Sequence, residues 1–151
     1  MINIKDTLRK VLIQEGYIDS IKFNTEIPVI FNIETTKHGE QQQGGRGIVF
    51  GTSDKGISDY DILKVINSFK IKIAELIYKN LIVHQQYFVI ESQAYLIGLI
   101  IIAEKNSSNC NEWTLKIHTN LRLTPERPFI KKFDKQLVLN DGGKHYYFSK
   151  G

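Results

Sequence analysis

Four histidines are the side chains of this 151-residue chain with the clearest potential for metal binding or acid–base chemistry, namely His38, His84, His118 and His145. None has a second ligand three or four residues away, so the spacing of a zinc site is missing. His118 falls in an alternating segment that places it beside Lys116 and Arg122 on an exposed strand face. This position favours a solvated histidine over a catalytic one.

Other candidate motifs also have structural explanations. Asp54, Asp59 and Asp61 could gather around a cation, but they surround a predicted helix start, where carboxylates stabilise the helix dipole. The glycine-rich stretch at 44–47 lacks the Lys-Ser/Thr ending of a phosphate loop and precedes a predicted strand. The single cysteine, Cys110, lies in a polar turn and cannot form an intrachain disulfide. We therefore expect no catalytic residue, no metal site, no cofactor and no enzymatic activity.

The basic charge is concentrated in the last quarter of the chain. From Lys116 onward there are eight Lys or Arg residues and three acidic residues, while the chain as a whole has a net charge of +4. Positive charge interleaved with aromatic rings suits nucleic acid, an acidic protein surface, or a solvated sheet edge protected by lysines. The residues concerned are Arg122, Arg127, Phe129, Lys131, Lys132, Phe133, Lys135, Lys144, His145, Tyr146 and Tyr147.

The residues 58–80 predict the long helix around which the chain is organised. Ser58 followed by Asp61 has the form of a capping box, which predicts the helix start. An apolar stripe follows at helical spacing, formed by Ile62, Val65, Ile66, Phe69, Ile73, Leu76 and Ile77. We expect the stripe to be core and to pack against the apolar segment 87–103.

The remaining pattern predicts a short N-terminal helix and a series of strands. The helix has its apolar stripe at Ile4, Leu8, Val11 and Leu12, and the strands are expected over 27–34, 47–51, 86–91, 94–104 and 112–123. Asp141-Gly142 between two apolar runs indicates a C-terminal hairpin. Because the strand over 94–104 is apolar on both faces, it belongs in the middle of a sheet.

Strict alternation characterises the segment 112–123. The residues predicted to face inward are Trp113, Leu115, Ile117, Thr119 and Leu121, and those predicted to face outward are Glu112, Thr114, Lys116, His118, Asn120 and Arg122. Together the elements predict an α+β fold: a mostly antiparallel sheet with the long helix packed on one face, a short N-terminal helix and a C-terminal hairpin extension. We expect one α+β domain over 1–123 and a basic extension over 124–151.

Two polar segments, 37–46 and 124–135, have too little apolar content to order themselves by burial. We expect both to extend away from the globular body and to order against neighbouring chains. The residues predicted to bind partners are Gln41, Gln42, Gln43, Arg46, Arg127, Phe129, Lys131, Lys132, Phe133 and Lys135.

The order of elements over the first 123 residues resembles small tail-terminator or connector subunits of tailed phages, in size and arrangement but without a diagnostic motif. The resemblance implies a non-enzymatic subunit that forms a homo-oligomer and contacts other protein subunits. Asp6 near the start, the lone cysteine and the absence of a long apolar run favour the cytoplasm, in a host cell or virion if the chain is of phage origin. The alternative is a small nucleic-acid-binding or toxin-neutralising accessory protein that uses the basic C-terminal surface.

Overall fold

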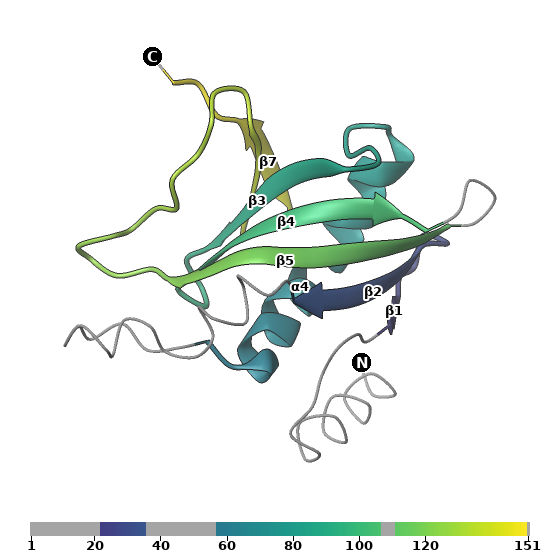
Figure 1. Cartoon of the computed structure of the whole chain (residues 1–151), viewed down its shortest axis with the longest axis horizontal. Helices are drawn as coiled ribbons and strands as arrows, with labels where there is room; N and C mark the ends of the chain where they lie inside the picture. The colour runs from purple at the N-terminus through teal and green to yellow at the C-terminus, as the bar shows by residue number, and fades with distance from the viewer. Residues whose placement is uncertain (1–21, 36–56, 107–110, 151) are drawn as a thin grey trace.

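The computed structural model describes residues 22–35, 57–106 and 111–150, which form one helix and one seven-stranded sheet (Figure 1). The helix is α4 (Asp59–Tyr78), and the strands are β1 (Lys22–Asn24), β2 (Ile30–Thr35), β3 (Gln86–Ser92), β4 (Ile97–Lys105), β5 (Glu112–Arg122), β6 (Leu137–Asn140) and β7 (Lys144–Tyr147). The predicted N-terminal helix, the segment 37–46 and the strand over 47–51 lie outside the described residues.

The sheet has the order β1-β2-β5-β4-β3-β6-β7, so the doubly apolar strand β4 is at its centre, as predicted. The prediction of a mostly antiparallel sheet is wrong, because the sheet is mixed: β2 pairs parallel with β5, and β3 pairs parallel with β6. A parallel pair requires a connection that returns to the starting end of the sheet. The segment between β5 and β6 makes such a return, and Figure 1 shows it leaving the end of β5 and coming back to the β6–β7 hairpin.

Helix α4 begins where its capping box predicts. The Asp61 backbone N–H donates to Ser58 Oγ at 3.1 Å, and the Ser58 backbone N–H donates to Asp61 Oδ2 at 3.3 Å. These two bonds satisfy donors that have no partner inside the helix. The helix ends at Tyr78, two residues before Asn80, which has a positive φ of 60°.

The apolar stripe of α4 forms the main core with one face of the sheet, which we call the helix face. Phe69 is 3% exposed, and Phe31, Phe88 and Leu115 of the sheet are fully buried in the same cluster. The predicted core role of the helix is therefore confirmed, and its partner surface includes the predicted segment 87–103. Figure 1 shows α4 behind the central strands β3, β4 and β5.

The alternation predicted for β5 holds only as far as Ile117. Ile117 pairs with Ile101 and Thr119 pairs with Ile100, so His118 is an additional residue between two adjacent pairs. Such a β-bulge reverses which face each later residue occupies. His118 is half-buried and meets the Tyr87 ring edge-on, with ring centroids 5.9 Å apart.

The bulge reverses the predicted orientation of the four residues that follow it in β5. Thr119, predicted to face inward, lies opposite Ile100, which packs on the face of the sheet away from α4. Asn120, predicted to face outward, is 2% exposed and lies opposite Leu99 of the main core. Arg122, also predicted outward, has its Nη2 3.5 Å from Asp61 Oδ2 in the first turn of α4. Leu121, predicted inward, packs on the opposite face of the sheet.

Replacing Phe69 by Ala should lower the free energy of unfolding by about 3–5 kcal/mol, because it empties a buried aromatic site between α4 and the sheet. Urea denaturation followed by circular dichroism measures this change. Asn67→Ala on the exposed side of the same helix is the matched control and should change stability by no more than about 0.5 kcal/mol. A loss below about 1 kcal/mol for Phe69→Ala would contradict the core role of the stripe.

Candidate interaction surface

The face of the sheet opposite α4 carries a second, smaller apolar cluster. Val89 of β3 and Val138 of β6 are fully buried there together with Ile130, which lies outside the strands. Partly buried Ile100, Leu121 and Phe148 pack around them. No helix covers this cluster among the described residues, and the residues 124–136 between β5 and β6, which we call the crossing segment, supply its cover through Ile130.

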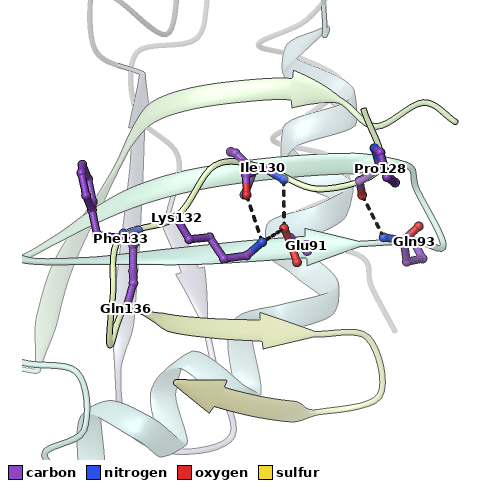
Figure 2. Close-up of polar contacts among 7 residues, drawn as sticks. All are labelled: Glu91, Gln93, Pro128, Ile130, Lys132, Phe133 and Gln136. Atoms are coloured by element: carbon purple, nitrogen blue, oxygen red, sulfur yellow. Dashed lines mark hydrogen bonds and ion pairs between the residues drawn. The ribbon is translucent and has the colours of Figure 1, made fainter. Parts of the chain in front are cut away.

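One buried carboxylate fixes the crossing segment on this face (Figure 2). Glu91 Oε2 accepts the Ile130 backbone N–H at 3.0 Å and lies 2.5 Å from Lys132 Nζ. The Lys132 ammonium also donates to the Ile130 carbonyl at 2.9 Å. The Glu91 and Lys132 side chains are 3% and 5% exposed, so the ion pair is almost fully desolvated. An ion pair of this kind is stable only when its remaining polar groups are hydrogen-bonded, and here the backbone of Ile130 provides both bonds.

Aromatic rings enclose the ion pair. Lys132 Nζ lies 5.3 Å from the centre of the Phe129 ring and 5.4 Å from that of Phe148, within the range of cation–π attraction. Burial raises the pKa of the Tyr146 hydroxyl, and the negative charge of Glu91 adds to this effect. The rings and the hairpin thus shield Glu91 and Lys132 from water.

Gly98 of β4 permits the close approach of the crossing segment. A Cβ atom at this position would lie 3.3 Å from Ile130 Cβ and 3.3 Å from Leu123 Cδ2. Both distances are shorter than ordinary van der Waals contacts, so a side chain at this position would require Ile130 or Leu123 to shift by a few tenths of an ångström.

Further hydrogen bonds hold both ends of the crossing segment. Leu123 N–H donates to the Leu96 carbonyl at 2.8 Å at the start of the segment. At its other end, Lys135 N–H donates to the Phe148 carbonyl at 2.6 Å, and Phe148 N–H donates to the Gln136 carbonyl at 2.8 Å. With Lys135 at a φ of 64°, this pattern is a β-bulge that turns the segment into β6.

The β6–β7 hairpin is tied to the β3–β4 turn through Asp141. Its Oδ1 accepts from Ser92 Oγ at 2.8 Å, and its Oδ2 accepts the backbone N–H groups of Gln93 and Ala94 at 2.7 and 3.1 Å. Gly142 and Gly143 have φ values of 84° and 74°, which the turn requires and glycine adopts without strain. The predicted hairpin is confirmed, and through β6 it continues the main sheet.

The structure separates the predicted partner-binding residues into exposed and buried groups. The exposed ones are Arg127, Phe129, Lys131, Phe133 and Lys135. Ile130 is buried and the Lys132 side chain is only 5% exposed, so the prediction that 124–135 extends freely away from the body is wrong at these two residues. The reason is the buried carboxylate of Glu91, which accepts the Ile130 N–H and pairs with Lys132, and which the prediction overlooked. Gln41, Gln42, Gln43 and Arg46 lie outside the described residues.

Four exposed aromatic side chains lie on the crossing segment and on β7. The exposed fractions are 62% for Phe129, 76% for Phe133, 40% for Tyr146 and 49% for Tyr147. Figure 2 shows the Phe133 ring pointing away from the Glu91–Lys132 pair. We call the exposed part of the crossing segment and the β6–β7 hairpin the C-terminal surface.

Sequence reasoning missed Glu91 and Gly98, although each carried a signal. Glu91 follows three consecutive apolar residues in a segment expected to be buried, and a carboxylate in that setting requires a cationic or N–H partner. Gly98 interrupts an apolar strand, which often marks a close backbone approach.

A separate pocket of about 400 Å³ lies at the C-terminal end of α4. It includes Tyr78, His84 and Trp113, and its remaining lining residues are both apolar and polar, the polar ones being Asn80, Lys105 and Asn111. His84 Nδ1 accepts the Lys105 backbone N–H at 2.9 Å, which leaves the proton on Nε2. None of the described residues that line this pocket is a carboxylate, so His84 has no acidic partner there for acid–base chemistry.

Comparisons of the chain with protein-family models, with curated proteins and with solved structures find no match. Within the part of the chain that the structure describes, no group of three or more His, Cys, Asp or Glu side chains is arranged to hold a metal ion. In the same residues, no helix has the length and apolar content to cross a membrane.

Replacing Lys132 by Met should destabilise the protein by about 3–5 kcal/mol, because the Glu91 charge then stays buried without its cation. Lys131→Met removes a neighbouring but exposed lysine and should change stability by no more than about 0.5 kcal/mol. Chemical denaturation of both variants measures the difference.

The double variant Glu91→Gln/Lys132→Met should recover most of the loss, because neither charge is left unpaired. Equal effects of the Lys131 and Lys132 substitutions would show that the ion pair does not hold the crossing segment.

Proposed function

We propose that this protein is a non-enzymatic assembly subunit that binds a second copy of itself, and further protein subunits, through the C-terminal surface. The observation that carries the proposal is the exposure of Phe129 and Phe133 on a segment that buried contacts hold in place. Aromatic residues are enriched at protein interfaces and supply much of their binding energy.

Anchoring of the crossing segment lowers the conformational entropy that is lost when such an interface forms. A segment that orders only on binding loses conformational entropy at that step, which weakens the association. Here Glu91, Lys132 and Ile130 have already fixed the backbone that presents both phenylalanines. The exposed Arg127, Lys131 and Lys135 would form the polar rim of the contact.

The proposal agrees with the resemblance to tail-terminator and connector subunits of tailed phages. In that setting the chain would be made in the host cytoplasm and would close a ring with its neighbours. The nucleic-acid alternative draws less support, because Lys132 is neutralised internally by Glu91 and is withdrawn from the basic surface. The carboxylate of Asp134, which accepts the Lys150 backbone N–H at 2.8 Å, further lowers the positive charge of this surface.

Substituting Ser for both Phe129 and Phe133 should raise the dissociation constant of the assembly at least about tenfold, since exposed aromatic anchors dominate interface energies. Sedimentation velocity over a micromolar concentration series measures this shift. Tyr78→Ser is the matched control, because Tyr78 is as exposed as Phe133, at 76%, but lies at the end of α4. It should leave assembly unchanged.

A wild-type protein that remains monomeric throughout the series would overturn the proposal. Monomeric protein that binds DNA or RNA with steep salt dependence would instead establish the nucleic-acid alternative.

A further inference from the structure

Within the C-terminal surface, β7 forms an exposed edge of the sheet. It is the last strand after β6, and all four of its residues are exposed. No further strand pairs with its outer side among the described residues. Such an edge presents backbone N–H and C=O groups that another strand can bind.

The hydrogen-bond pattern of the hairpin determines which backbone groups point outward. Phe148 N–H donates to the Gln136 carbonyl, which marks these two residues as a hydrogen-bonded pair. Hydrogen-bonded and non-hydrogen-bonded pairs alternate in an antiparallel ladder. The opposed residues Tyr146 and Val138 are then hydrogen-bonded to each other. The N–H and C=O groups of His145 and Tyr147 therefore point away from β6.

β7 is short, at four residues, but it lacks most other features that protect an edge strand. It has no proline, and no bulge interrupts its register with β6. Its only lysine, Lys144, is at its first position, beside the turn. The outward groups of His145 and Tyr147 are thus accessible to a partner strand.

We propose that β7 pairs antiparallel with β7 of a second copy of this chain, around a two-fold axis at Tyr146. This inference rests on the proposed function and specifies its contact. Antiparallel pairing requires that two residues with outward backbone groups lie opposite each other, and His145 opposite Tyr147 of the second copy satisfies this requirement. The symmetric contact then contains about four backbone hydrogen bonds, two from each His145–Tyr147 pair.

Charge and side-chain complementarity favour an identical strand as the occupant. In this register Tyr146 lies opposite Tyr146 of the second copy, and Lys144 lies opposite Phe148 of the second copy. The lysines therefore meet aromatic rings and not each other, which avoids like-charge repulsion and permits cation–π contact.

The exposed aromatic anchors adjoin the same edge. The residues that follow β7 bind the crossing segment twice, through the Lys135–Phe148 bond at 2.6 Å and the Lys150–Asp134 bond at 2.8 Å. Phe133 precedes these contacts directly in the chain. Edge pairing would thus bring the C-terminal surfaces of two copies together and extend one sheet across both.

Disulfide trapping tests the register of the proposed contact, in a chain whose single cysteine, Cys110, is replaced by Ser. Tyr146→Cys should form a covalent dimer with oxidised glutathione, because residues opposite each other in a non-hydrogen-bonded pair have Cα atoms about 4.5 Å apart, within disulfide range. Lys144→Cys is the matched control and should remain monomeric in non-reducing electrophoresis. In the proposed register, residue 144 of one copy lies several residues away from residue 144 of the other.

His145→Pro provides an independent test, because it removes an outward N–H without removing a bond to β6. It should weaken assembly at least about tenfold in sedimentation velocity, since the symmetric contact loses one donor from each copy. His145→Ala keeps the N–H and should assemble like the wild type. Amide exchange gives a readout without substitution: the His145 and Tyr147 amides should become protected only at assembling concentrations, while the Tyr146 amide is protected at all concentrations.

The outcomes separate this inference from the proposed function. Wild-type assembly that survives His145→Pro, without cross-linking of Tyr146→Cys, would overturn the β7 contact and leave the assembly function standing. A wild-type protein that never assembles would overturn both.

Discussion

Burial of the α4 stripe against one face of the sheet is the interaction on which the rest of the structure depends. Phe69 and its neighbours on α4 remove the helix face from water, and the central strands β3, β4 and β5 supply the complementary apolar surface. The hydrophobic effect is nondirectional and scales with buried apolar area, so this cluster, the larger of the two, contributes the larger share of the hydrophobic stabilisation. It also leaves the two faces of the sheet unequal. The face without a helix keeps a smaller apolar cluster around Val89 and Val138, and the chain closes it with its own crossing segment.

That closure combines one apolar contact with a polar one, and the two have different consequences. Ile130 contributes burial, but a single side chain allows several placements of the segment. The Glu91 carboxylate allows far fewer, because it must receive both the Ile130 N–H and the Lys132 ammonium to offset its desolvation. Gly98 makes this geometry accessible by letting Ile130 approach the sheet. A segment with a polar composition thus acquires a fixed backbone, and its exposed phenylalanines acquire fixed positions.

The same arrangement relates the fold to the proposed assembly function. An anchored segment presents Phe129 and Phe133 without an ordering cost at the moment of binding. The crossing segment also bonds to the residues after β7, so the aromatic side chains and the open strand edge belong to one rigid region. The parallel β3–β6 pair places this region at the sheet margin, where a second chain can reach it.

The sequence by itself determined the elements whose signals are local. The Ser58–Asp61 capping box and the helical spacing that includes Phe69 predicted α4 and its buried face, because both depend on residues within a few turns of each other. The apolar strand β4 and the Asp141-Gly142 hairpin were predictable for the same reason. Tertiary structure alone decided the bulge at His118, which reversed the faces of Asn120 and Leu121, since a bulge is a property of the pairing with β4 and not of β5 alone. It also decided that Lys132 is buried and Lys131 is exposed. The two lysines are equivalent in the sequence, and only the position of Glu91 across the sheet distinguishes them, because a buried carboxylate recruits the cation within its reach.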